Sequence, residues 1–171
     1  GFLCRSTDAG VTWSCQAPTG MGLMAATTLD ASTGSLQAIA STGQQIWMAL
    51  DNTSTLFRSR DDGVTWTNTT QLSTAGSPIN AVKCLSPTQC VALVSSPSAT
   101  SLEAFRTTDA GLTWTRTLNE TRGDRVTALV GLGQGVVVAL GDPTSTTVPY
   151  GYRSADFGAT WNYIPPAGIT N

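Results

Sequence analysis

The hydrophobic residues of this chain fall into short runs, separated by polar stretches rich in Gly, Ser, Thr, Asp and Pro. Short runs of this kind are typical of β-strands, whereas a helix needs a longer stretch with a period near 3.6 residues. We therefore expect two strands near the N-terminus and four in each of three later units. The expected strands cover residues 2–5, 11–16, 36–41, 45–50, 56–60, 64–70, 79–85, 90–95, 102–107, 112–118, 125–132, 136–141, 150–154 and 159–164.

One polar octet, Ser/Thr-x-Asp-x-Gly-x-Thr-Trp, separates the last two strands of every unit. Its copies span residues 6–13, 59–66, 107–114 and 154–161, and their Asp residues lie 53, 48 and 47 residues apart. A period of this size indicates repeated supersecondary units. Besides the Thr that precedes each Trp, the residues that all copies share are Asp8, Gly10, Trp13, Asp61, Gly63, Trp66, Asp109, Gly111, Trp114, Asp156, Gly158 and Trp161.

The residue types of the octet predict a hairpin turn. Ser and Asp side chains accept hydrogen bonds from backbone N–H groups one to three residues onward, which stabilises a tight reversal. Gly supplies a positive φ, and the alternation after it places Trp on the buried face of the next strand. Each copy is therefore expected to form strand, turn and strand.

The octet resembles the Asp-box of the bacterial neuraminidase (BNR) repeat, and the resemblance covers nearly the whole chain. In that family the box is the hairpin between the third and fourth strands of a β-propeller blade, and it supports the fold while ligands bind elsewhere. Two positions depart mildly from the pattern: Thr107 replaces Ser, and Phe157 is bulky for its slot.

The resemblance implies an all-β fold: a β-propeller, or a segment of one, with about three and a half four-stranded antiparallel blades. We expect one domain over residues 1–171, with blade parts 1–35, 36–78, 79–124 and 125–171. The apolar run Met21–Leu29 fits either an extra outer strand or the first strand of the next blade.

Three and a half blades leave the expected ring open. The N-terminus offers strands three and four of a blade, and the C-terminus offers no strands one and two to complete it. Either more chain lies outside this segment, or another copy completes the sheet by strand addition. Residue 1 is Gly and no signal-peptide pattern opens the chain, so we expect a processed or excised segment.

The composition argues against several kinds of chemistry. The net charge is −2 with a single lysine, Lys83, so the basic footprint of a nucleic-acid-binding protein is absent. No run reaches the roughly 20 apolar residues of a membrane span. There is no His, the commonest general base and zinc ligand. We expect no cofactor, no metal and no catalytic residue.

Repetition in register indicates a structural duty for the box residues, because an active site is built once per ring and a turn once per blade. The same holds for four arginines that each precede a box Asp by three residues. These are Arg5, Arg58, Arg106 and Arg153.

Sialidases, which resemble the chain in the boxes alone, need an arginine triad, a Tyr nucleophile with its Glu, and an acid/base residue. The arginines outside the repeat are Arg60, Arg116, Arg122 and Arg125, and the glutamates are Glu103 and Glu120. Xyloglucanase-type glycosidases would need two opposed carboxylates, and the sequence does not pair Asp51, Asp124 or Asp142.

The four cysteines indicate an oxidising compartment. Cys4 and Cys15 flank the first box, and Cys84 and Cys90 flank a short turn, so each pair could form a disulfide across a hairpin. Four buried thiols are the alternative, and a zinc site is the less favoured one.

Three N-x-Ser/Thr sequons favour a secreted glycoprotein. They begin at Asn52, Asn68 and Asn119, with Asn52 and Asn119 expected in loops and Asn68 at the end of a strand. Ser- and Thr-rich loops at 95–101 and 142–149 could carry O-linked sugar.

Together these features predict a non-catalytic, extracellular glycoprotein propeller that acts as a structural or interaction module. Its expected partners are other copies of itself, or other extracellular proteins or glycans. Open sheet edges would allow it to assemble into larger or filamentous structures. The alternatives are a segment of an Asp-box glycoside hydrolase, sialidase- or xyloglucanase-like, and a binding propeller like sortilin or the photosystem-assembly propellers.

Overall fold

The computed structural model describes residues 3–6, 8–16, 36–41, 47–51, 55–61, 67–72, 79–95, 101–121, 124–143 and 150–165. Every regular element in these ranges is a β-strand. No helix in them is long and apolar enough to cross a membrane. Met21–Leu29, which the sequence leaves open, lies outside the described residues.

The strands form one two-stranded and three four-stranded sheets, each a meander of antiparallel neighbours. The first sheet contains β1 (Leu3–Arg5) and β2 (Ser14–Gln16). The second contains β3 (Leu36–Ser41), β4 (Trp47–Asp51), β5 (Thr55–Ser59) and β6 (Thr67–Gln71). The third contains β7 (Ile79–Cys84), β8 (Cys90–Ser95), β9 (Leu102–Thr107) and β10 (Thr115–Glu120). The fourth contains β11 (Asp124–Gly133), β12 (Val136–Pro143), β13 (Tyr150–Ser154) and β14 (Asn162–Ile164).

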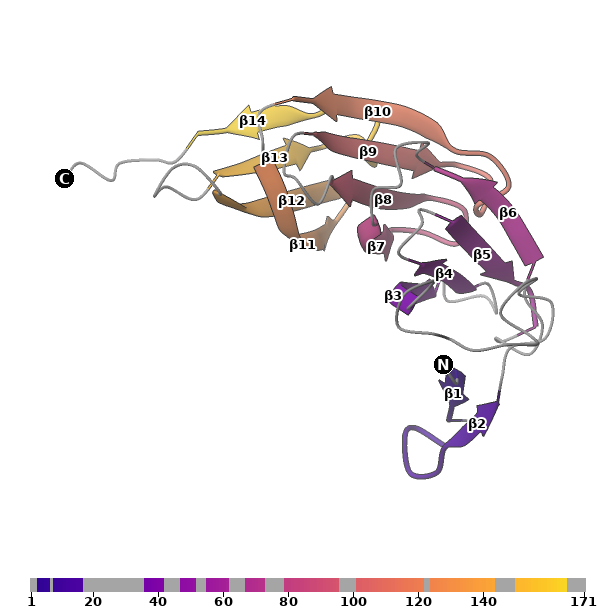
Figure 1. Cartoon of the computed structure of the whole chain (residues 1–171). Coiled ribbons are helices and arrows are strands. Elements are labelled where there is room, and N and C mark those ends of the chain that lie inside the picture. The colour runs from indigo at the N-terminus through magenta and orange to yellow at the C-terminus, as the bar shows by residue number, and fades with distance from the viewer. Residues whose placement is uncertain are drawn as a thin grey trace.

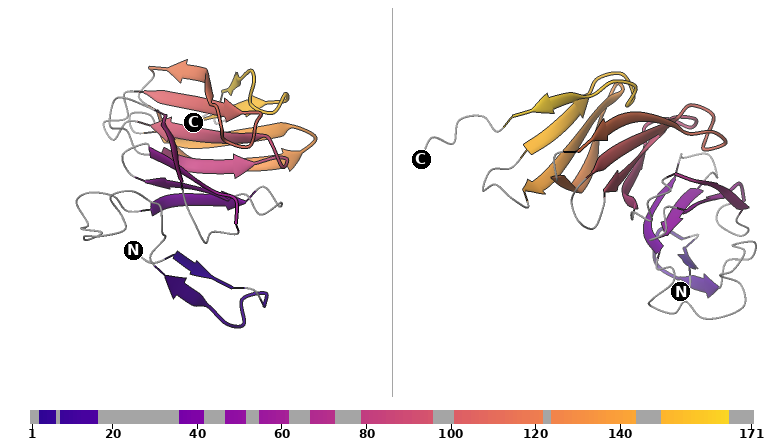
Figure 2. Two further views of the ribbon diagram at one scale, coloured as in Figure 1. Left: turned by 90° about the vertical axis from the view of Figure 1, so that its right-hand side faces the viewer. Right: turned by 45° about the horizontal axis from the view of Figure 1, so that its top comes forward.

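The sheets follow one another along an arc, with the two termini towards its opposite ends (Figures 1 and 2). The first strands of the blades lie together on the inside, since β7 contacts both β3 and β11. The last strands, β6, β10 and β14, follow the outer rim (Figure 1). This is the all-β arrangement of four-stranded antiparallel propeller blades that the sequence predicts.

The third sheet is buried on both faces, which explains why β8 is a continuous apolar run. Successive strand residues point to opposite faces. Cys90, Ala92 and Val94 therefore pack in one cluster and Val91 and Leu93 in another, all of them at most 1% exposed.

The two clusters join neighbouring sheets. In the first cluster, Leu56 of β5 and Leu72, which directly follows β6, pack with Phe105 of β9. The second brings Val137 and Tyr152 of the fourth sheet against the opposite face of the third. Each interface therefore contains apolar side chains from two successive blades, so a blade depends on its neighbour for its core.

The expected strand bounds hold well before the boxes and less well after them. Strands 36–41, 90–95, 102–107 and 150–154 coincide with β3, β8, β9 and β13. The strands after the boxes begin later than expected, at Ser14, Thr115 and Asn162, because the box residues through Trp still belong to the turn. β12 continues through Pro143, into the expected 142–149 loop.

Phe157, the bulky departure from the repeat, packs on the turn between β11 and β12. Its backbone N–H donates to the Gly135 carbonyl at 2.8 Å. A Cβ added to Gly135 would lie 2.6 Å from Cε2 of the Phe157 ring. The large side chain is accommodated because glycine stands opposite it.

Gly158 and Gly10 occupy the same place in two boxes but differ in their surroundings. Gly158 has a φ of +80, and a Cβ there would lie 2.5 Å from Cγ2 of Val91. Gly10 has a φ of +92, and its nearest neighbour is an atom of Trp13 at 3.8 Å. Glycine at 158 therefore serves both the turn and close contact with the preceding sheet.

We expect Gly158→Ala to destabilise the protein by about 2–4 kcal/mol, because backbone strain and a clash with Val91 add. Gly10→Ala, the matched control, should cost only the strain, about 1 kcal/mol. Equilibrium urea unfolding of the two variants measures the difference. Equal losses at the two positions would contradict this account of the contact with Val91.

Candidate functional site

The third box shows how the octet closes its turn. The Thr107 hydroxyl donates to Oδ1 of Asp109 at 2.8 Å and accepts the Gly111 N–H at 2.9 Å. The Asp109 carboxylate accepts the Thr113 N–H on Oδ1 at 2.9 Å and the Thr113 hydroxyl on Oδ2 at 2.6 Å. Both carboxylate oxygens thus hold the residue four positions onward, a longer reach than the one to three residues expected from sequence.

The first and fourth boxes repeat these bonds. Asp8 accepts the Thr12 N–H at 2.8 Å and its hydroxyl at 2.6 Å. Asp156 accepts the same groups of Thr160 at 2.9 and 2.6 Å. In the second box Ser59 donates to Asp61 at 2.7 Å, and residues 62–66, which include Gly63 and Trp66, lie outside the described residues.

The first, third and fourth boxes each have two consecutive residues in the left-handed region, the residue after Asp and the glycine. A non-glycine residue at positive φ is uncommon, and the bonds from Asp and from Ser or Thr hold it there. The residues and their φ values are Ala9 (55), Gly10 (92), Ala110 (58), Gly111 (84), Phe157 (59) and Gly158 (80).

The hydrogen bonds lower the pKa of Asp8, Asp109 and Asp156 from 3.8 to about 2. At Asp156 the Thr160 hydroxyl is the largest cause, and at Asp8 it is the Thr12 hydroxyl. At Asp109 burial raises the pKa, but the bonds from Thr113 and Thr107 outweigh that effect. A carboxyl with a low pKa stays ionised, which suits a hydrogen-bond acceptor and not a general acid.

The box tryptophans do not share one environment. Trp114 and Trp161 are half-buried and pack against the clusters shared with the preceding sheet. The Trp161 indole N–H donates to the Thr117 hydroxyl of that sheet at 3.2 Å. Trp13 is 63% exposed, so the expectation of a buried ring is wrong there. The Trp13 indole N–H donates to the Gly10 carbonyl of its own box at 3.0 Å, and no described sheet precedes this hairpin.

The box aspartates do not gather at one point. They belong to four different hairpins, and each binds within its own octet. Within the described ranges no three His, Cys, Asp or Glu residues lie close enough together to hold a metal ion.

The four repeated arginines also differ from blade to blade. Arg58 is buried; burial and the nearby Arg60 lower its pKa, and the negative charge of Asp109 in the following box opposes them. Arg106 is half-buried and Arg153 is exposed, while the side chain of Arg5 lies outside what the structure describes.

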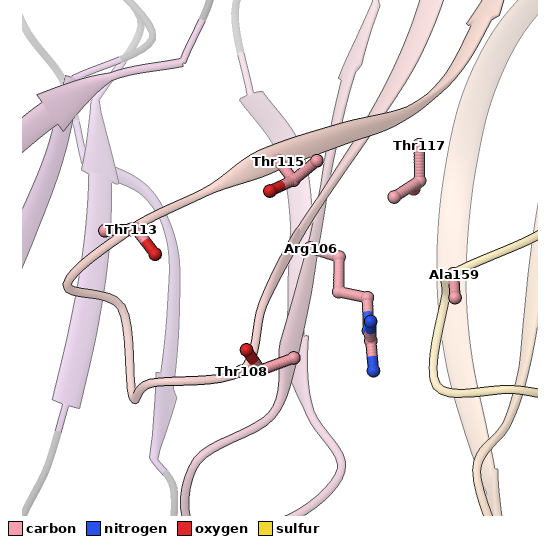
Figure 3. Close-up of a pocket in the computed structure, with 6 residues that line it drawn as sticks. All are labelled: Arg106, Thr108, Thr113, Thr115, Thr117 and Ala159. Atoms are coloured by element: carbon pink, nitrogen blue, oxygen red, sulfur yellow. The ribbon is translucent and has the colours of Figure 1, made fainter.

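A groove runs between the third box and the fourth (Figure 3). Its volume is about 290 Å³. The residues that line it are Arg106, Thr108, Thr113, Thr115, Thr117 and Ala159. The sequence did not predict this groove. Its threonines come from β10 and the third box, Ala159 comes from the next blade, and no local pattern links the two blades.

Cys84 and Cys90 form a disulfide across the β7–β8 hairpin, with their Cα atoms 3.9 Å apart. This pairing agrees with the sequence prediction. Cys4 and Cys15 stand directly opposite each other in the β1–β2 register. Their disulfide remains a prediction, since their side chains lie outside the described set.

Of the three sequons, only the one at Asn119 is described in full. Asn119 is exposed and lies in β10, on the outer rim, so its expected place in a loop is wrong. Asn68 is the second residue of β6, and Asn52 falls outside the described residues.

No family model matches this sequence, and no curated protein matches it either. Solved structures do resemble it. A YCF48 protein bound to a D1 peptide aligns with 77% of this chain and 41% of its own, at 20% identity and a TM-score of 0.58. A GH74 xyloglucanase from Xanthomonas campestris covers 76% of this chain and 23% of its own, at 19% identity and a TM-score of 0.57. A Hadza microbial sialidase, Hz136, covers 96% of this chain and 40% of its own, at 16% identity and a TM-score of 0.56.

These neighbours are BNR or Asp-box-type propellers, so the arc of sheets is a propeller fold. The chain spans about two fifths or less of their lengths. At such low identity the likeness extends to the fold and not to a particular activity.

We expect Thr160→Val to raise the pKa of Asp156 towards 3.8 and to cost about 1 kcal/mol, because the shortest bond to the carboxylate is lost. A lowered folded-state pKa gives stability that is complete above the unfolded value of 3.8 and lost as pH falls towards 2. The variant's stability should therefore fall less steeply over this range.

An NMR titration of the side-chain carboxyl carbons, with unfolding at several pH values, measures both effects. Thr108→Val is the matched control, because this exposed threonine makes no hydrogen bond to a box carboxylate within the described residues. An unchanged Asp156 titration in Thr160→Val would refute the assignment.

Proposed function

We propose that this protein is a non-catalytic propeller module of the cell exterior, which associates with further blades of its own kind through the two ends of its arc. The observation that carries the proposal is an uncovered apolar face on the fourth sheet. The same kind of face is buried wherever two described four-stranded sheets meet.

The uncovered face, here called the open face, is formed by Val130, Leu132, Leu140 and Ile164. Their exposed fractions are 42, 65, 47 and 38%. Leu140 and Ile164 lie on either side of Gly151 in the strand register, so they share one face. Val137, Ala139 and Tyr152 point to the other face and are buried. An apolar sheet face of this kind is an expected site of association.

The first hairpin presents the complementary end of the arc. Its Trp13 and Val11 are 63 and 80% exposed. In the third and fourth boxes the equivalent tryptophans cover the face of the preceding sheet. Trp13 therefore has the residue type and position to cover the open face of another molecule.

Since the two ends differ and complement each other, their contact would be head-to-tail. Such a contact generates a ring if the rotation closes and a filament if it does not. For the chain by itself, we propose a second copy as the occupant of the open face.

The carboxylates support a non-catalytic role. Asp8, Asp109 and Asp156 are tied up in their turns. Glu103 of β9 pairs with Arg116 of β10 across neighbouring strands, at 2.7 Å. The Cys84–Cys90 disulfide and the exposed Asn119 sequon favour a secreted glycoprotein.

We expect Leu132→Lys to weaken self-association by about tenfold or more, because a charge replaces an apolar side chain that the contact would bury. Sedimentation velocity over a range of concentrations measures it. Leu112→Lys is the matched control, since Leu112 is 53% exposed but belongs to the third box, away from both ends.

Trp13→Ser, at the other end of the arc, should reduce association to the same degree as Leu132→Lys. Wild-type protein that remains monomeric at every concentration, or a Leu112→Lys effect equal to that of Leu132→Lys, would count against head-to-tail contact.

When this protein is expressed and secreted from eukaryotic cells, we expect it to carry a glycan on Asn119. Intact mass before and after treatment with an N-glycosidase measures it, and Thr121→Ala, which removes the sequon, is the control. A mass difference between the wild type and Thr121→Ala that equals only the change from Thr to Ala would show that Asn119 is not modified.

A further inference from the structure

The groove between the third and fourth boxes contains a positive charge that has no partner among the described residues. Arg106 enters it from β9, and in Figure 3 its guanidinium lies between Thr108 and Ala159. The Nε atom is buried and has no hydrogen-bond partner. None of the six lining residues is acidic. A polar group removed from water without a partner is costly, more so when it is charged.

The preceding interface shows how the chain can compensate such a charge. The Nε atom of Arg58, the equivalent residue one blade earlier, is likewise buried without a hydrogen-bond partner among the described residues, but Arg58 feels the negative charge of Asp109 in the following box. Arg106 has no corresponding charge interaction in the part of the chain that is described. The two arginines therefore differ in the nearby negative charge, not in the pairing of Nε.

Among the described residues neither neighbouring box carboxylate accepts a hydrogen bond from the Arg106 side chain. Both oxygens of Asp109 are bound to Thr113 and Thr107. Both oxygens of Asp156 are bound to Thr160 and Ser154. Moving either one to Arg106 would break the bonds that hold its turn.

We propose that the groove is a binding site for a carboxylate group, with the Arg106 guanidinium as its principal donor. A guanidinium matches a carboxylate with paired N–H donors, and such charge-assisted bonds are among the stronger ones. A volume of about 290 Å³ accommodates a group the size of an acidic side chain. The lining includes no aromatic ring on which a sugar could stack. The site does not depend on association through the open face.

The carboxylate could belong to an acidic residue of another protein or to a free small acid. An NMR titration that follows the ¹⁵N-resolved Nε–Hε signals of the arginines distinguishes these two sources. Its probes are sodium acetate and the peptide acetyl-Gly-Glu-Gly-amide. We expect both to shift the Arg106 signal in a saturable manner. Tighter binding of the peptide indicates a protein source, and equal or tighter binding of acetate indicates a small acid.

Two neutral probes and sulfate test the chemical class. Acetamide has nearly the same shape as acetate, and acetyl-Gly-Gln-Gly-amide nearly the same shape as the Glu peptide, but neither is charged. Neither should therefore shift the Arg106 signal. Sulfate should bind more weakly than acetate. Binding of acetamide equal to that of acetate, or of sulfate equal to or tighter than that of acetate, would overturn the assignment to a carboxylate.

Variants locate the site. Arg106→Gln should weaken peptide binding by about ten- to a hundredfold, and Arg106→Lys, which keeps the charge but not the paired donors, by less. Arg153→Gln is the matched control, because Arg153 holds the same repeat position on the last blade and is exposed. Thermal unfolding confirms that each variant is folded. Unchanged binding in Arg106→Gln, or no saturable shift in the wild type, would disprove the proposal.

Discussion

The carboxylate of the box aspartate is the interaction on which the architecture depends. One oxygen accepts a backbone N–H and the other a hydroxyl from the threonine four residues onward, at 2.6–2.9 Å in the first, third and fourth boxes. This pair of bonds holds two left-handed residues in succession, the second of them glycine. In the fourth box that glycine lets the turn approach Val91, and the following Trp161 reaches Thr117. A local turn thereby also sets the contact between blades.

Because each blade shares its core with its neighbour, the sheets at the two ends of the arc differ from the one between them. The third sheet has a neighbour on both faces and buries every side chain of β8 from Cys90 to Val94. The fourth sheet has one such neighbour among the described residues and leaves an apolar face uncovered. Burial of apolar area is the main driving force for association. This uncovered face is the basis of the proposed association with further blades.

The sequence predicted the features that depend on local chemistry. Gly and Asp in the octet were enough to place the turns, and β-branched and apolar runs were enough to place strands such as β8 and β9. Features that depend on another blade were not predictable in the same way. Trp13 holds the same octet position as Trp161, yet it is exposed because nothing described lies beyond it. The groove at Arg106 joins Thr117 to Ala159, 42 residues later in the chain, and no local pattern links the two.

The central claim is that the repeated aspartates stabilise the turns before the last strand of each blade, and equilibrium urea unfolding of Asp109→Ala tests it most directly. Asp109 lies in the blade buried on both faces, where the loss of a turn affects both clusters. The account predicts a loss of about 2–4 kcal/mol in the free energy of unfolding. A variant within about 0.5 kcal/mol of the wild type would contradict it.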